Sequence, residues 1–470
     1  MRTLQNFGFV GALSALALGG AATAHEGHDH NTPSGLWPAH VESESQAIPA
    51  SYAASESEEN GHADLDLRIT AWKLSDGSTG FSSQDSQTNN IVTSVLSDVN
   101  TVAYDDQYVY VRTSGIPSHD IGSADDPNPA KAGDLDATYR IIRSPTEETG
   151  EKTATGLSSI GIMVNGVSFY NQSDGTAWNP ATNDLSGQVG GGGPGGGPGG
   201  GGPGGGDPGG GDPGGGDPGG GGEATASWST NALWSRREGL DDAGGHASPE
   251  FGQTNPDGSI LGLYHYHQTP YGLMEQIDPE NNGAMGSPIV GYAFDGYAVV
   301  GPYAYVEEED GSLSVMQMTS SYGLQDNRGV DGPSVEDYAL GSFIEDFVYF
   351  EGTGTLNEYN MAFVKFDEDC RAVVTDETDP EGDWAYFLTL DVLEAMSGNV
   401  TDIDGDLAFP YIVGPEYFGV VDAELLAPGA VITVPDDVSY FFEYGAVPEP
   451  ASIVILLAGA AALMLRPPRR

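Results

Sequence analysis

A run of glycine and proline between residues 190 and 222 limits what the rest of the chain can fold into. It repeats Gly-Gly-Gly-Asp-Pro, and its aspartates are spaced five residues apart, at Asp207, Asp212 and Asp217. Glycine at this density cannot form a core, and the regular prolines keep the chain extended, so the run predicts a flexible Gly/Pro/Asp linker. Its aspartates could attract calcium, but a solvated spacer is the simpler interpretation. The linker separates two foldable stretches, residues 64–189 and 223–440.

Short strand patterns occur on both sides of the linker. Residues alternate in polarity from Tyr108 to Arg112 and around Leu65, Leu67 and Ile69, as is typical of half-buried strands. Within Ile160 to Phe169, Asn165-Gly166 is a favoured two-residue turn and predicts a β-hairpin. After the linker, the candidate strands are Pro288 to Phe294, Tyr297 to Val300, Phe343 to Phe350, Trp384 to Leu390 and Val431 to Val434. We predict a mainly β fold, sandwich- or barrel-like, with many short strands, long loops and few helices.

The first 24 residues have the order of a secretory signal peptide. Arg2 supplies the positive start, Phe7 to Leu18 is a short apolar run, and Ala22-Thr23-Ala24 offers small residues for cleavage. A transmembrane anchor is the alternative, but the run is too short to cross a bilayer of about 30 Å. Residues 25–63 follow as a polar, histidine-rich leader, which we expect to be mobile.

The last residues, 447–470, form a second targeting signal. Val447-Pro448-Glu449-Pro450 precedes the apolar segment Ala451 to Leu465, and arginines close the chain at Arg466, Arg469 and Arg470. This order resembles the PEP-CTERM sorting signal. The resemblance implies transient recognition by a membrane-embedded exosortase, and processing at the envelope of a Gram-negative bacterium. An ordinary C-terminal anchor helix is the alternative. Both interpretations predict an exported body that meets the membrane only through its tail.

Charge and cysteine content exclude two classes of protein. The chain has 69 acidic and 16 basic residues, a formal charge of −53. Nucleic acid is therefore excluded as a natural partner, because its phosphates would be repelled. Such acidity also suits a saline exterior, so acidity alone does not indicate a metal site. Cys370 is the single cysteine, which excludes an internal disulfide.

Two histidines two residues apart are the first candidate metal ligands. The segment reads Tyr264-His265-Tyr266-His267. On a strand, residues two apart point to the same face, so His265 and His267 would stand together, with Tyr264 and Tyr266 on the other face. Neutral imidazole suits Zn and Cu. The alternative is a pair of polar residues on a solvated strand face.

The same four residues match the motif that names the YHYH domain family. Further blocks that resemble this family follow in order between residues 65 and 420, with the linker inside them: Gly115-Ile-Pro-Ser-His119, Gly161-Ile-Met-Val-Asn165-Gly166, Trp178-Asn179, Asp241-Asp-Ala-Gly-Gly-His246, Ser287 to Gly296, Gly301-Pro302-Tyr303, Trp384 to Thr389 and Phe409 to Gly419. The resemblance implies no established reaction for this chain, and metal binding in the family is inferred from its histidines.

The family-like blocks add His246 and His119 to the candidate ligands. Each histidine alone is more often a surface or hydrogen-bonded residue. Together with His265 and His267 they would fill a tetrahedral zinc shell, or three of them would leave one position for water. The chain departs from the family pattern in having Ala243 where a cysteine often stands, and in a long spacer after His246.

Other candidate ligands lie outside these blocks or at a turn. In the leader, His25, His28 and His30 could chelate copper, especially if cleavage made His25 the N-terminus. Asp295 could be a ligand, a hydrogen-bond partner of a ligand histidine, or a turn residue, and we favour the turn. The aspartates of the segment 402–406 resemble half of a calcium loop, but the downstream glutamate is missing, so we interpret the segment as a turn.

These observations leave three functional hypotheses. The leading one is an exported cell-surface protein that holds Zn or Cu at His265 and His267. The second is a metal-dependent enzyme, a hydrolase or an oxidase, that acts on an extracellular polymer. The third is a structural protein of an exopolysaccharide or biofilm matrix, in which the tyrosines and histidines pack without metal. The resemblance to PEP-CTERM proteins implies an association with exopolysaccharide and biofilm, so an extracellular polysaccharide is the partner that suits the second and third hypotheses.

Overall fold

The structure, a computed structural model, describes residues 66–82, 91–121, 130–188, 228–235, 239–241, 243–279, 283–329, 332–390, 408–426 and 432–445. The predicted signal peptide, the leader, the Gly/Pro/Asp linker, the calcium-like segment 402–406 and the predicted sorting tail lie outside these residues. No helix among the described residues is long and apolar enough to span a membrane.

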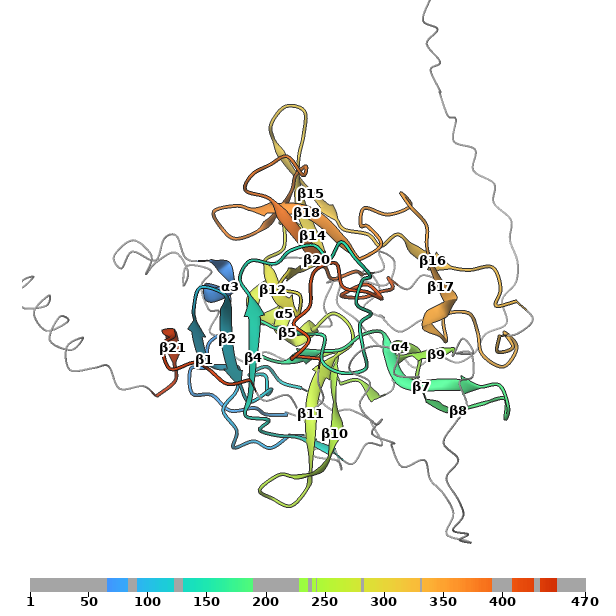
Figure 1. Cartoon of the computed structure of the whole chain (residues 1–470), viewed down its shortest axis with the longest axis horizontal. Coiled ribbons are helices and arrows are strands. Elements are labelled where there is room, and N and C mark those ends of the chain that lie inside the picture. The colour runs from blue at the N-terminus through green and yellow to red at the C-terminus, as the bar shows by residue number, and fades with distance from the viewer. Residues whose placement is uncertain are drawn as a thin grey trace, which may run out of the picture.

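The fold is mostly β, as the sequence predicts, and its larger sheet curls into a half-barrel (Figure 1). The strands of this 12-stranded sheet lie in the order β10 (Gly245–Thr254), β11 (Ile260–Tyr266), β6 (Ser168–Phe169), β5 (Gly161–Met163), β12 (Ile289–Ala293), β13 (Ala298–Val300), β20 (Asp383–Phe387), β18 (Met361–Phe366), β19 (Ala372–Val374), β14 (Tyr303–Glu307) and β15 (Leu313–Gln317), with β3 (Ala130–Ala132) paired to β11. Strands from both sides of the linker therefore share one sheet.

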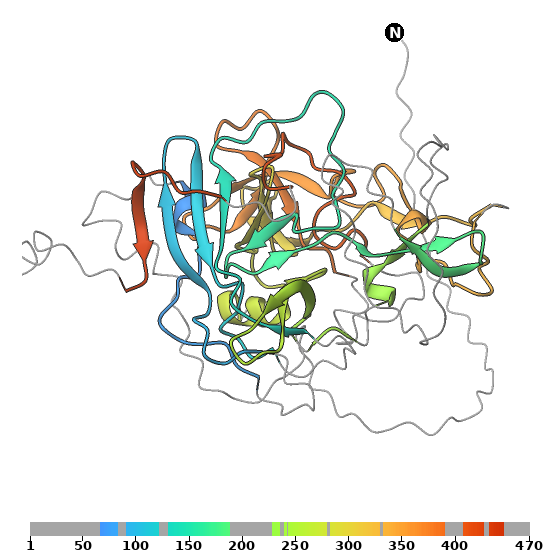
Figure 2. The ribbon, with the colours of Figure 1, turned by 60° about the horizontal axis from the view of Figure 1, so that its bottom comes forward.

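Three smaller sheets flank the half-barrel. The first has the order β21 (Ser439–Glu443), β1 (Val99–Tyr104), β2 (Tyr108–Thr113) and β4 (Ala137–Ile142). The second has the order β8 (Asp184–Gln188), β7 (Ser173–Asn179) and β9 (Ser229–Asn231), and the third pairs β16 (Tyr322–Leu324) with β17 (Phe347–Tyr349). Figures 1 and 2 show the four-stranded sheet at one side of the molecule and β7 and β8 at the other.

Helices among the described residues are short: α3 (Leu67–Thr70), α4 (Ala232–Ser235), α5 (Tyr271–Ile277) and the 3₁₀ turn η2 (Ile344–Asp346). One large apolar cluster fills the space between the sheets, and its fully buried side chains include Phe169, Tyr264, Tyr266 and Tyr292. The tyrosine face of the motif segment is therefore core.

Two strand predictions were wrong. The alternation around Leu67 and Ile69 forms the helical turn α3, because the Asp66 side chain accepts a hydrogen bond from Arg68 N and caps the turn. The described part of the segment 431–434, from Ile432, forms no strand, and Pro435, which lacks a backbone N–H, follows it. By contrast, the predicted hairpin at Asn165-Gly166 is present between β5 and β6, with Gly166 at a φ of 79°.

Candidate metal centre

Three histidines come together where β10 pairs with β11. In the antiparallel register His246 stands directly opposite His265, and His267 follows the last residue of β11. The ring centroids are 4.5 Å apart for His246 and His265, 4.9 Å for His265 and His267, and 5.5 Å for His246 and His267. One nitrogen of each ring lies within 4.8 Å of the others, and all three side chains are buried. We call these residues the histidine triad.

Hydrogen bonds to backbone carbonyls fix the tautomers of two of these rings. Nδ1 of His265 donates to the carbonyl oxygen of Leu263 at 3.1 Å, and Nδ1 of His267 donates to that of Asn171 at 2.7 Å. A carbonyl oxygen only accepts, so the proton of each neutral ring is on Nδ1. Each Nε2 then carries a lone pair.

The two Nε2 atoms face one another at 3.1 Å. Two lone pairs at this distance repel unless a proton or a metal cation lies between them. In a tetrahedral zinc site, with Zn–N bonds of about 2.0 Å, two ligand nitrogens are roughly 3.3 Å apart. The observed separation therefore fits two ligands of one metal ion, and His246 supplies a third imidazole from the neighbouring strand.

Tyr170 lies against two rings of the triad and was not found from the sequence. Its ring stacks on His265 at a centroid distance of 4.0 Å and meets His267 edge-on at 5.8 Å. Burial raises the pKa of the Tyr170 hydroxyl, so this side chain is neutral near pH 7. Tyr170 directly follows β6, a two-residue strand that carries no periodicity to mark it as part of a site.

His119 lies on the other side of β11, with the motif tyrosines. Its Nε2 accepts a hydrogen bond from the Tyr266 hydroxyl at 2.8 Å, and its Nδ1 donates to the carbonyl oxygen of Asp120. Burial lowers the pKa of His119 to about 4, so the ring is neutral at physiological pH. The structure does not bring this histidine to the triad.

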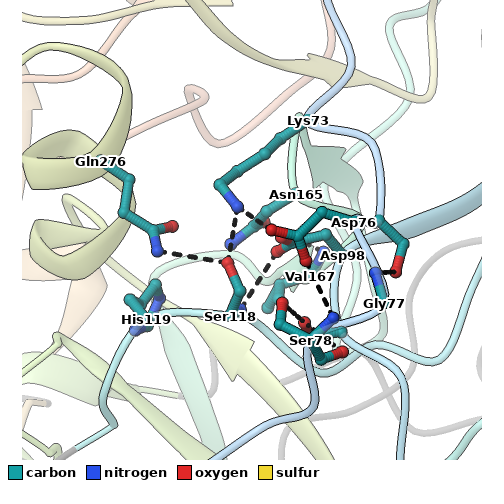
Figure 3. A network of polar contacts seen from close by, with 12 residues as sticks. Lys73, Asp76, Gly77, Ser78, Asp98, Ser118, His119, Asn165, Val167 and Gln276 are labelled. Carbon is teal, nitrogen blue, oxygen red and sulfur yellow. Dashed lines mark hydrogen bonds and ion pairs between the residues drawn. The ribbon is translucent and has the colours of Figure 1, made fainter. Parts of the chain in front are cut away.

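A polar network surrounds the residue before His119 (Figure 3). Lys73 forms a buried ion pair with Asp98 and donates to Ser118 Oγ at 2.5 Å, and Gln276 donates to the same oxygen at 3.2 Å. Asp98 has a φ of 62°, which is uncommon for a residue other than glycine. The network holds the loop that carries His119 against α5 and against the start of β1.

Asp295 is a buried turn residue between β12 and β13, in keeping with the turn interpretation. One of its oxygens accepts hydrogen bonds from the Tyr386 hydroxyl at 2.7 Å and from Gly419 N at 2.9 Å. Burial raises the pKa of this carboxyl to about 6. Its partners are a tyrosine and backbone groups, and the triad is built without it. The leader histidines His25, His28 and His30 lie outside the described residues.

A comparison with family models matches residues 138–397 to the family described as YHYH protein. The chain belongs to the YHYH family. The matched region contains the whole triad, together with Tyr170 and Asp241, whereas His119 precedes it. The region ends before the PEP-CTERM-like tail of this YHYH protein. No curated protein and no solved structure shows a significant match.

Proposed function

We propose that this YHYH protein is an exported metal-binding protein that holds Zn or Cu through His246, His265 and His267. The observation that carries the proposal is the pair of Nε2 atoms at 3.1 Å, which carry lone pairs in the neutral rings because each Nδ1 donates its proton to a carbonyl oxygen. All three donors are imidazoles, which suit these two metals. Export is supported by the signal-peptide-like start and the PEP-CTERM-like end.

The lack of a disulfide explains why a bound metal would contribute to the stability of this fold. The described chain has a free cysteine and no disulfide, so a bound ion is an additional cross-link between β10 and β11. An ion that binds the native state alone stabilises it by about 2.7 kcal/mol at a free concentration of 100 times Kd.

The test is metal analysis of the full chain, secreted by a Gram-negative host and purified without a histidine tag. We expect about one Zn or Cu ion per chain. His265→Ala, His267→Ala and His246→Ala should each lower both the metal content and the melting temperature. A chelator should lower the melting temperature of the wild type but not that of the variants.

His119→Gln is the matched control, because it changes a buried histidine on the other face of β11. It should keep the metal content even if it lowers stability. Full metal content in the His265→Ala/His267→Ala double variant, or a wild type that binds neither metal, contradicts the proposal.

A metal-dependent enzyme is the second candidate, and one observation favours it. The triad supplies three protein ligands, and a Zn²⁺ ion with three protein ligands keeps one coordination position open, as catalytic zinc sites do. Hydrolysis of extracellular polysaccharides by the metal-loaded wild type, lost in His265→Ala, would select this alternative.

A further inference from the structure

A tight turn between Asp241 and Gly245 leads directly to His246, and the carboxylate of Asp241 closes this turn. Asp241 Oδ1 accepts hydrogen bonds from Ala243 N at 2.9 Å and from Gly245 N at 3.0 Å. The backbone N–H of Asp241 donates to the Gly245 carbonyl oxygen at 2.8 Å. The turn therefore ends at the residue immediately before His246, with its geometry set by Asp241.

The same carboxylate ties this turn to β11. The Tyr264 hydroxyl donates to Asp241 Oδ2 at 2.7 Å, and both side chains are buried. Tyr264 precedes His265, so this hydrogen bond links the turn before His246 to the residue before His265. Tyr264, the first tyrosine of the Tyr-His-Tyr-His motif, thus contacts the turn that precedes His246, and it does so from the face of β11 opposite His265.

Glycine at position 245 allows the turn to lie directly on the Tyr264 ring. A Cβ atom at Gly245 would lie 2.5 Å from both Cζ and the hydroxyl oxygen of Tyr264, closer than side-chain atoms approach. Gly244 has a φ of 86°, which other residues rarely adopt. The position of His246 is therefore coupled to the position of the Tyr264 ring.

The three histidines are positioned by different parts of the fold. His265 is on β11, which has strand partners on both sides, and His267 is held by the Asn171 carbonyl. β10 ends the sheet path and pairs, among the described strands, with β11. His246 is the second residue of this edge strand, so the turn that precedes the strand helps to fix its position.

We infer that Asp241, anchored by the Tyr264 hydroxyl, is a positioning residue that sets His246 at metal-binding distance from His265 and His267. The inference rests on the proposed metal function of the triad. Partners that orient a metal ligand typically change metal affinity 10- to 100-fold when they are removed. Asp241 and Tyr264 do not belong to the group of possible metal ligands, so they would act through the backbone that leads to His246.

The experiment measures Zn²⁺ affinity by competition with a chelating dye, in the full exported chain and in Tyr264→Phe. This substitution removes one hydroxyl group and keeps the buried ring. We expect Zn²⁺ affinity to fall at least tenfold. In chains loaded with Co²⁺, the visible spectrum should also change, because the third ligand is displaced.

Tyr386→Phe is the matched control, since Tyr386 is also a buried tyrosine that donates to a buried aspartate, Asp295, at 2.7 Å. It should lower stability by a similar amount and leave Zn²⁺ affinity unchanged. Equal losses of affinity in the two variants would show a general effect of destabilisation and would overturn the inference.

A double-mutant cycle separates positioning from general structure. In a His246→Ala background, Tyr264→Phe should have no further effect on the remaining weak Zn²⁺ affinity, because its effect passes through His246. Additive losses overturn the inference. A wild type that binds Zn²⁺ with the same affinity as Tyr264→Phe overturns the inference alone, whereas a wild type that binds neither Zn nor Cu overturns the proposed function with it.

Discussion

Buried carboxylates in this chain receive hydrogen bonds from distant segments, and only some of their donors are cations. Asp98 pairs with Lys73, and Asp346 with Arg328, which donates to both of its oxygens at 2.6 Å. Asp241 and Asp295 instead receive a tyrosine hydroxyl and backbone N–H groups. With 16 basic residues for 69 acidic ones, cations are scarce, and tyrosine is a neutral donor that needs no counter-charge.

Asp295 should give the protein a measurable pH dependence. Its pKa is about 6 in the fold, because of burial, against 3.8 for an unperturbed aspartate. Between these values the native state binds more protons than the unfolded state, so this residue's contribution to stability falls as the pH rises from 4 to 6 and is constant above. The total change is about 3 kcal/mol.

Urea denaturation of the wild type and Asp295→Asn at pH 4, 5, 6 and 7 checks this prediction. The difference in unfolding free energy between them should change by about 3 kcal/mol, with the wild type losing stability as the pH rises. Asp310→Asn is the control: hydrogen bonds with Ser312 lower the pKa of this exposed aspartate, so its effect should have the opposite sign. Parallel curves for wild type and Asp295→Asn would refute the assignment.

At the scale of elements, the strand β11 shows what periodicity can and cannot predict. The period of two predicts that His265 and His267 lie together, and they do, within the triad. Periodicity could not place His119, because a loop residue has no strand face, and the structure puts it beside Tyr266. Periodicity also could not predict the hydrogen bond from Tyr264 to Asp241, because a contact between a strand and a turn distant in sequence leaves no local pattern.

The position of His246 also could not be predicted from periodicity. Its family-like block made it a candidate, but only the register of β10 on β11 shows that it faces His265. The mainly β class followed from the short alternating segments. The curl of the sheet and the order of its strands depend on long-range packing that these segments do not encode.

Lys73 joins several elements, and its removal should be costly. The side chains of Lys73 and Asp98 are 8% and 2% exposed, so Lys73→Met would leave a buried carboxylate without its charge partner. Breaking such a pair costs about 3–5 kcal/mol. Burial raises the pKa of Asp98, and the charge of Lys73 opposes this rise. Removing Lys73 should therefore raise the pKa of Asp98 further, so the variant's loss of stability relative to the wild type should be smaller at low pH.

Urea denaturation at pH 7 measures the cost, and Lys73→Met/Asp98→Asn is the informative second variant. Removing both charges should restore part of the lost unfolding free energy, because no unpaired carboxylate remains. If the double variant is as unstable as the single one, packing of the lysine stem rather than charge pairing explains the loss.

At the scale of the whole molecule, the chain leaves and re-enters the same small sheet around the linker. Gln188 at the end of β8 pairs with Thr176 of β7, and Ser229 at the start of β9 pairs with the next residue, Ala177, on the other side of β7. Strands lie about 4.8 Å apart, so the two ends are separated by about 10 Å. The fold therefore needs only a short connection here.

Deleting residues 190–222 should leave the fold and its metal content intact. Val189 and residues 223–227 would remain as the connection, and at about 3.3 Å per residue they reach about 20 Å. Loop-closure entropy varies slowly with length, so the unfolding free energy should change by no more than about 2 kcal/mol. Chemical denaturation and metal analysis of the deletion variant check this; a loss of several kcal/mol would show that the glycines pack.

The sharing of one sheet by both sides of the linker also determines when the histidine triad can form during folding. The carbonyl that holds His267 belongs to Asn171, 96 residues earlier, and His265 pairs with Ser168 on β6. Contacts of such sequence separation form slowly, because the entropy of closing the intervening loop is lost before the contact stabilises the fold. A growing chain carries the carbonyl long before it carries the histidines. If the triad binds a metal as proposed, loading would follow the pairing of these two stretches, and a bound ion would report that they have come together.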